Sequence, residues 1–347
     1  MALDVPASAS GAKPSGDGTE HEGFGLARPV ADASPMAAEA AGFTPREARG
    51  HKVTRVVSPT ISVRQRMREI WLSRELLMYL VRTEIKVKYK NSVLGLVWSL
   101  IAPAMTLAIY FVVFQFISKN GIPHFVIFLF SGLLLWNLFQ LAVQTGTGVI
   151  VNNAGIVKKV SFPREILALA SVGSATVFFF FQAIVMVIFL IAFHSDPAWG
   201  FMPLIPLALL ATMVLAAGLG ILLSSINVYL RDTQHLIEVV LTAWFWACPI
   251  VYSFQNQLAP RLKLHGLTFL YFLNPMTPLV LSFQRALYGH VVVNSTVPPH
   301  LVAHELPAHA LGWYAALDSG VLALGIVLFV VALVVFGRLE GNFAEEL

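Results

Sequence analysis

The sequence predicts an all-α membrane protein with six transmembrane helices, an N-terminal amphipathic surface helix and external re-entrant half-helices between spans five and six. Of its 347 residues, 57% are hydrophobic and only 12% are charged, whereas about a quarter of the residues of a soluble domain are charged. Six apolar stretches are each long enough to cross a bilayer, which requires roughly 20 residues. The charged residues lie between these stretches and at both ends of the chain.

The first element is a polar N-terminal tail. Residues 1–55 are rich in Ala, Gly, Pro and Ser and contain few large apolar residues. Such a segment buries too little surface to offset its chain entropy, so we predict a disordered cytoplasmic tail. It lacks the apolar core of a cleaved signal peptide.

Residues 61–92 are predicted to form a basic amphipathic helix that lies along the membrane surface. Leu76, Leu80 and Ile85 recur at helical spacing on one half, and basic side chains occupy the other. The separation is imperfect, because Glu84 and Lys88 intrude on the apolar half. A surface helix tolerates such charges, whereas a membrane-spanning helix does not.

The six predicted spans form a domain at 93–337, followed by a cytoplasmic C-terminus at 338–347. The basic segments 52–90, 152–165 and 229–234 fall on one side of the membrane, and the turns 118–124 and 194–200 fall on the other. The excess of Lys and Arg on the cytoplasmic side places both termini in the cytoplasm. The predicted spans are 93–117, 125–151, 166–193, 201–228, 235–254 and 313–337.

The outer segment 255–312 contains two short apolar pieces, each about half the length of a span. Thr277 and Pro278 are suited to begin a helix of about 11 residues that ends at Gly289. One interpretation is a re-entrant hairpin buried in protein. The other is an amphipathic cap on the external surface.

Missing motifs narrow the possible functions. No G-x-x-x-x-G-K-[ST] sequence is present, so the chain does not bind ATP through a P-loop. No pair of acids typical of a metal-dependent sugar transferase is present. His304 and His309 lie five residues apart around Glu305, whereas a zinc-protease helix needs a spacing of four, and Pro307 interrupts the helix. His300 and His304 could share a helical face, but Pro298 and Pro299 precede them, so no metal site is predicted. The basic residues flank spans, where they interact with lipid rather than nucleic acid. Cys248 is the single cysteine, which excludes an internal disulfide.

Basic and aromatic residues are the remaining candidates for a binding function. Lysines of the surface helix are suited either to a phosphate or to lipid headgroups. The loop 152–165 is either an anchor for membrane orientation or a docking element for a cytoplasmic partner. Aromatic residues of the first and fifth spans either face lipid and the protein core or stack on sugar rings. These aromatic candidates are Tyr110, Phe114, Trp244, Trp246 and Tyr252.

Four separated runs of sequence resemble a known family. They are RELLMYLVRTEIKVKYKNSVLGLVWSLIAP, KKVSFPREIL, INVYLRDTQHL and NPMTPLVLSFQRALYG. Together they resemble the permease subunit of ABC type-2 polysaccharide exporters, the group that exports O-antigen, teichoic acid and galactan. The resemblance covers about 61–347. The ending RLEGNFAEEL and the long Ala- and Pro-rich head look most like actinobacterial galactan exporters.

The resemblance implies a homodimer that works with two copies of a separate ATPase, which would hold the ATP and Mg²⁺, so no cofactor is expected in this chain. It implies that the loop 152–165 couples to the ATPase, through Lys158, Lys159, Phe162 and Arg164. The surface helix would be a gate for the lipid-linked substrate, whose diphosphate would meet Arg82, Lys86, Lys88 and Lys90. Spans one and five would line a channel, and the half-helices would close its outer mouth.

The leading hypothesis is therefore the membrane subunit of an ATP-driven exporter in the bacterial inner membrane. It would move a polyprenyl-diphosphate-linked polysaccharide, expected to be galactan, to the outer side. The alternative is an integral lipid-linked sugar or acyl transferase, which would need a cluster of catalytic groups at one membrane face. A proton-driven carrier is a third class, but the spans contain few ionisable residues.

Overall fold

The computed structural model describes residues 62–88, 98–119, 121–264, 271–289 and 305–347. Every regular element in these ranges is helical, which confirms the all-α prediction. The predicted tail 1–55, Lys90 and most of the external loop with His300 and His304 lie outside the described residues.

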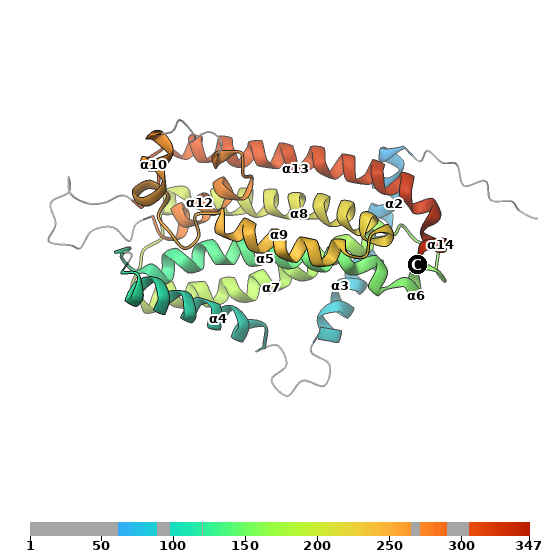
Figure 1. The fold of residues 1–347 in the computed structure, drawn as a ribbon, viewed down its shortest axis with the longest axis horizontal. Coiled ribbons are helices and arrows are strands. Elements are labelled where there is room, and N and C mark those ends of the chain that lie inside the picture. Colours follow the sequence, from blue (N-terminus) through green and yellow to red (C-terminus); the bar gives the residue numbers. More distant parts are fainter. Residues whose placement is uncertain (1–61, 89–97, 120, 265–270, 290–304) are drawn as a thin grey trace, which may run out of the picture. The chain divides into compact units, whose positions relative to one another are not determined.

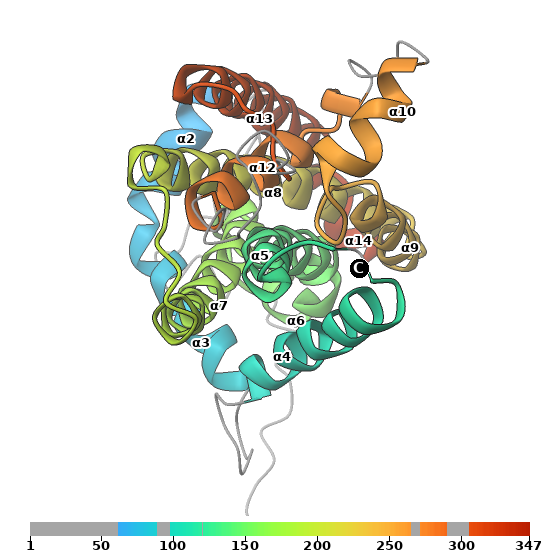
Figure 2. The same cartoon turned by 90° about the vertical axis from the view of Figure 1, so that its left-hand side faces the viewer.

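Four helices of the described ranges are long and apolar enough to cross a membrane. Helix α8 contacts both α13 and α5, and α5 contacts α7, so the four helices lie side by side (Figures 1 and 2). Helices of this length extend about 40 Å, which exceeds the hydrocarbon thickness of a bilayer. They are α5 (Phe125–Asn152), α7 (Glu165–Ala192), α8 (Leu204–Tyr229) and α13 (Leu311–Leu339).

Glycines allow these helices to approach closely. A Cβ added at Gly146 of α5 would lie 3.2 Å from the Cα of Gly220 of α8. A Cβ at Gly218 would lie 3.0 Å from the backbone nitrogen of Phe329 of α13. Small residues at such crossings are typical of membrane helix pairs, where van der Waals contact drives association.

The fifth predicted span is shorter in the structure, whereas the described part of the first reaches its predicted end. Helix α4 (Trp98–Phe111) continues as a π-helical segment, η2 (Val112–Ile117). Helix α9 (Thr233–Trp246) has 14 residues, whereas the sequence predicted a continuous span to residue 254. Pro249 follows closely after its end, and a proline disfavours helical geometry in the residue before it. The chain turns there and resumes as η4 (Phe254–Leu258) and α10 (Ala259–Leu264).

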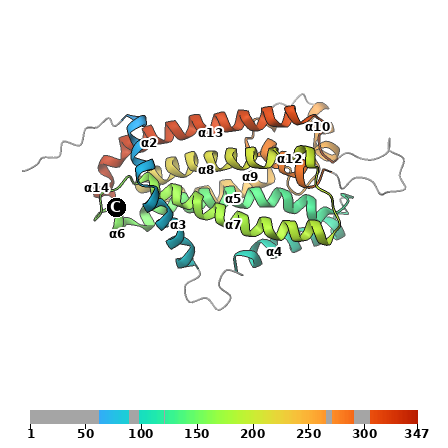
Figure 3. The same cartoon turned by 180° about the vertical axis from the view of Figure 1, so that it is seen from behind.

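The surface segment consists of two helices rather than the single one predicted. Helix α2 (Val63–Leu72) ends at Ser73, and α3 (Arg74–Lys88) begins directly after it. Figure 3 shows α2 crossing α13 and α3 crossing α7, and both pairs are in contact. Val81 is buried in a notch at Gly173 of α7, where an added Cβ would lie 2.7 Å from the Val81 side chain.

Helix α12 (Met276–Leu287) is buried on nearly all sides by α5, α8 and α13. Its length of about 18 Å is roughly half of a bilayer. The predicted cap Thr277 lies inside the helix, and the side-chain oxygen of Asn274 accepts a 3.0 Å hydrogen bond from the Met276 amide instead. This burial is compatible with a half-helix enclosed by protein, and the re-entrant path stays a prediction.

Candidate functional site

The basic residues of the surface helix fall into two groups. Arg82 and Lys86 are exposed on α3. Lys88 is exposed as well, but its ammonium lies over the ring of Phe178 of α7, 4.4 Å from the ring centre. An ammonium at this distance from a ring face makes a cation–π contact. All three candidate phosphate ligands within the described residues are therefore exposed, and Lys88 is the one that also contacts α7 through a ring.

Glu84 faces two serines of α7. The Ser171 hydroxyl lies 3.5 Å from the Glu84 Oε1 atom. Burial raises the pKa of the Glu84 carboxyl, while hydrogen bonds from Ser174 and Ser171 and the charge of Lys88 act in the opposite direction. Desolvation lowers the pKa of Lys88, opposed by the charge of Glu84. This pair ties α3 to α7 through polar contacts in addition to the apolar contact of Val81.

Three of the five predicted channel aromatics form one cluster, in which Tyr110 of α4 and Phe114 of η2 meet Trp246 of α9. The Tyr110 ring centre lies 6.2 Å from that of Phe114 and 6.2 Å from that of Trp246. The centres of Phe114 and Trp246 are 6.4 Å apart. Trp246 is about half exposed, so the cluster presents an aromatic face at the surface of the described chain.

Trp244 and Tyr252 are directed elsewhere. The Trp244 indole N–H donates a 2.7 Å hydrogen bond to Asn274, and its ring contacts Phe139 of the central helix α5. The hydroxyl groups of Tyr252 and Tyr271 are 2.9 Å apart. The five predicted aromatics therefore do not share one surface, and Trp244 and Tyr252 fasten the turn after α9 to the segment before α12.

The loop between α5 and α7 contains a short helix, α6 (Ala154–Val157), followed by the predicted coupling residues. Lys158 and Lys159 are exposed. The Phe162 side chain instead contacts the core at this end of the bundle, which includes Val149, Val228 and Phe336. The loop thus has two exposed cations held on an apolar anchor.

Arg164, the fourth predicted coupling residue, binds the C-terminal segment of the same chain. One of its N–H groups donates a 3.0 Å hydrogen bond to the Glu340 carbonyl. Its guanidinium also lies 3.8 Å from a Glu340 carboxylate oxygen and 5.8 Å from the centre of the Phe343 ring. The Tyr229 hydroxyl donates a 2.8 Å hydrogen bond to the neighbouring Leu339 carbonyl.

Arg66 completes a cluster of two cations and two carboxylates, which we call the ionic joint: Arg66, Arg164, Glu165 and Glu340. Arg66 is 8% exposed and donates hydrogen bonds to Glu165, which is 1% exposed, and to Glu340 at 3.1 Å. Glu165 stands in the first turn of α7, where a negative charge is favoured by the helix dipole. The joint connects α2, the end of the loop and the C-terminal segment.

The sequence analysis did not identify Arg66, Glu165 or Glu340 as functional residues. Arg66 lies 99 positions from Glu165 and 274 positions from Glu340 in the chain. No local pattern indicates such a pairing. Gly337 offers one weak signal, because a Cβ there would lie 2.9 Å from the Arg66 guanidinium.

Comparison with known proteins agrees with this architecture. Residues 75–288 match the family model described as ABC-2 type transporter. The chain is 32% identical over 227 residues to the O-antigen export system permease protein RfbA of Myxococcus xanthus, covering 65% of this chain and 84% of that protein. It is 27% identical over 273 residues to RfbA of Klebsiella pneumoniae, covering 79% of this chain and 95% of that protein. The four long apolar helices, the exposed loop lysines and the match across 75–288 together show that this chain belongs to the ABC-2 type transporter family of membrane proteins.

Proposed function

We propose that this chain is the permease subunit of an ATP-driven exporter of lipid-linked polysaccharide, with galactan as the favoured polymer and a polyprenyl diphosphate as the lipid. The family match and the names of the relatives support the class of transporter. The chain works as a homodimer with two copies of a separate ATPase, which hold ATP and Mg²⁺. Both termini face the bacterial cytoplasm.

The observation that carries the proposal is the construction of the loop between α5 and α7. Lys158 and Lys159 are exposed, while Phe162 and Arg164 hold the loop against the protein. Two exposed cations suit an acidic surface of the ATPase. The loop that carries them is firmly held, and a rigid contact transmits displacement, whereas a loose one does not.

The ionic joint extends this contact to the surface helices. Arg164 ends the loop, Glu340 belongs to the C-terminal segment, and Arg66 belongs to α2. Displacement of the loop by the ATPase therefore pulls on α2 through charged hydrogen bonds rather than through solvent. Helix α3, which follows α2 after Ser73, carries the exposed Arg82 and Lys86 for the substrate diphosphate.

The aromatic cluster of Tyr110, Phe114 and Trp246 is the proposed contact for sugar rings. Its members come from α4 and η2, which correspond to the first predicted span, and from α9, which corresponds to the fifth. Aromatic faces stack on the apolar faces of sugars without demanding one hydrogen-bonding pattern, which suits a polymer that must slide.

Reversal of the loop charges tests the proposal directly. The double variant Lys158→Glu/Lys159→Glu should lose co-purification with the ATPase, because two attractions become two repulsions. Lys263→Glu is the matched control, since Lys263 is an exposed lysine on α10, at the other end of the helices from α6 (Figures 1 and 3). Unchanged co-purification of the double variant would contradict this docking role.

A second experiment separates export from enzymatic activity. In cells, Arg82→Gln/Lys86→Gln should cause lipid-linked polymer to accumulate in the cytoplasm, whereas Arg64→Gln on the exposed side of α2 should not. Unchanged export in the double variant would refute the assignment of the diphosphate. Turnover of a glycosyl donor by the purified chain alone would refute the exporter in favour of a transferase.

A further inference from the structure

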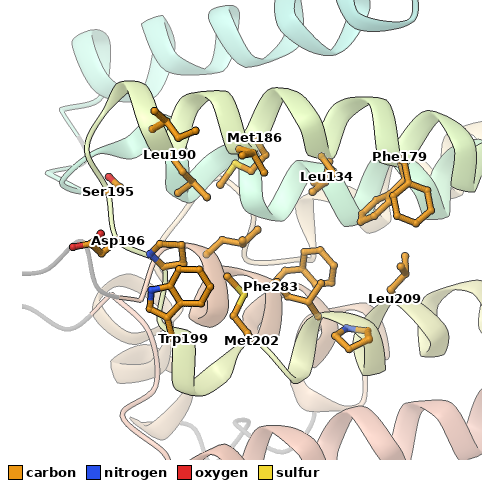
Figure 4. A pocket seen from close by; sticks show the side chains of 18 of the residues that line it. Leu134, Phe179, Met186, Leu190, Ser195, Asp196, Trp199, Met202, Leu209 and Phe283 are labelled. Carbon is orange, nitrogen blue, oxygen red and sulfur yellow. The ribbon is translucent and has the colours of Figure 1, made fainter.

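A long apolar groove lies between α7 and α8, distant in sequence from all the residues assigned so far. Its volume is about 980 Å³. Figure 4 shows Phe179, Met186 and Leu190 of α7 along one wall, and Met202 and Leu209 on the opposite side. Leu134 of α5 and Phe283 of α12, both almost fully buried, form the floor.

The length of the groove matches one leaflet of a bilayer. On α7 it extends from Phe179 to Ile191, and a helix of that length rises about 18 Å. Half of the hydrocarbon core is about 15 Å thick. Both walls belong to helices that are long and apolar enough to span the membrane, so the groove runs along the direction in which lipid chains lie.

Only one end of the groove is polar. His194, Ser195 and Asp196 lie in the turn between α7 and α8 and contribute to the lining there. Trp199 follows them and is 72% exposed. Tryptophan is enriched at the boundary between hydrocarbon and water. The groove is therefore amphipathic along its length, with an apolar body and a polar mouth at the level of lipid headgroups.

We propose that this groove binds one acyl chain of a phospholipid from the leaflet at the 194–199 turn, with the headgroup held at the turn. Asp196 attracts the ammonium of an ethanolamine headgroup, and His194 lies beside it as a hydrogen-bonding partner for the phosphate. A phospholipid is favoured over the polyprenyl carrier because the lining on α7 stops at Phe179, one leaflet deep. The site does not depend on the proposed export function.

The bound chain would also contact α12, because Phe283 and Leu287 of that helix line the groove. Helix α12 belongs to the segment that is expected to close the outer mouth of the channel. The lipid therefore acts as a packing element between α12 and the two long helices. If the groove were empty, each residue that lines it would lose dispersion contacts on the side that faces the groove.

Photolabelling of the full-length chain tests the site. The purified protein is placed in vesicles of phosphatidylethanolamine and phosphatidylglycerol that contain a phosphatidylethanolamine with a diazirine in its acyl chain. After illumination, the labelled residues are identified by mass spectrometry. We expect label on Val187 and Met202, which line the groove and are accessible from it, in preference to Ile184, which is exposed on α7 outside it.

A substitution that fills the groove provides the comparison. Ala183 lines the groove, and Ala183→Trp should lower labelling of Val187 and Met202 about tenfold, which corresponds to displacing roughly two methylene groups of the chain. Ile188→Trp is the matched control, because Ile188 is exposed on the same helix outside the lining. Should Ala183→Trp fail to fold, Leu209→Trp fills the groove from α8.

Three outcomes would overturn the proposal. Equal labelling of Val187 and Ile184 would indicate ordinary surrounding lipid without a site. Displacement of the label by polyprenyl phosphate, with no displacement by unlabelled phosphatidylethanolamine, would assign the groove to the carrier lipid. Absence of label together with cross-linking of two copies through Val187 would assign it to a subunit interface.

Discussion

Removal of Arg66 is the sharpest perturbation of the ionic joint, because it leaves a charge without a partner in a buried place. Glu165 is 1% exposed and Arg66 is its hydrogen-bonding cation. Breaking a buried ion pair from one side costs about 3–5 kcal/mol, since the remaining charge keeps its desolvation penalty. We expect Arg66→Met to destabilise the attachment of α2 by this amount.

The expected loss of stability differs among the members of the joint. The Glu340 side chain is 25% exposed, so solvent screens its interaction with Arg66. Glu340→Gln keeps the size of the side chain and should cost about 1 kcal/mol, because Arg66 retains Glu165. Arg64→Met is the matched control on the exposed side of α2 and should change stability by less than about 0.5 kcal/mol.

Amide hydrogen exchange measures the effect where it is expected. In the full chain in lipid nanodiscs, peptides that cover Val63–Leu72 report the opening of α2. A loss of about 3–5 kcal/mol raises the opening equilibrium roughly a hundredfold to a few thousandfold. Peptides from the middle of α5 serve as an internal reference, because the middle of that 28-residue helix lies about 20 Å along its axis from the end that leads into the loop.

A double-mutant cycle decides whether the interaction is the stated one. Replacement of both partners of a buried ion pair by apolar side chains is often close to neutral. In the double variant Arg66→Met/Glu165→Leu, the amides of α2 should therefore exchange much more slowly than in Arg66→Met alone. The reasoning is refuted if the double variant shows the sum of the two single effects, or if Arg66→Met behaves like Arg64→Met.

Two further predictions concern helix contacts. Gly218→Ala places a Cβ 3.0 Å from the Phe329 backbone nitrogen and should lower the free energy of unfolding by about 1–3 kcal/mol. Gly320→Ala is the control and should not destabilise the protein, because its Cβ would meet no packing neighbour within 4 Å. Thermal unfolding followed by tryptophan fluorescence compares the two variants, and equal midpoints would contradict the close crossing. Burial raises the pKa of Glu84 above its ordinary value of 4.5, so the folded chain holds its proton to higher pH than the unfolded chain, and stability falls as pH rises through that interval. Glu84→Gln should therefore raise the unfolding midpoint at pH about 8 and leave it nearly unchanged at pH about 4; the same gain at both values would exclude this cause.

The sequence by itself determined the class of the fold and the position of most helices. Long apolar stretches have no other stable form in a bilayer, because backbone groups must be paired within the segment. The second, third, fourth and sixth predicted spans agree closely with α5, α7, α8 and α13. The sequence also predicted the family, since each of the four motifs is an uninterrupted run of residues, and the family model matches 75–288.

Local signals were less reliable at helix ends. Hydropathy continues past Trp246, so the fifth span was predicted too long, although Pro249 marks the place where the helix cannot continue. Thr277 has the chemistry of a helix cap, but Pro275 precedes the helix in the structure, and the Met276 amide donates its hydrogen bond to Asn274. Several residues near each helix end have the chemistry to start or stop the helix, and tertiary contacts determine which of them does so.

Only the tertiary structure decided what each candidate side chain touches. The sequence grouped Lys88 with Lys86, and Trp244 with Trp246, yet Lys88 lies over Phe178 and Trp244 binds Asn274. The resemblance implied a role for Arg164 in coupling to the ATPase, and the structure adds that Arg164 binds Glu340 of the same chain. Composition and periodicity depend only on residues that are close together in the chain and on their preference for solvent or an apolar environment. The contacts named above join segments that are far apart in the sequence. Only the folded chain brings these segments within bonding distance.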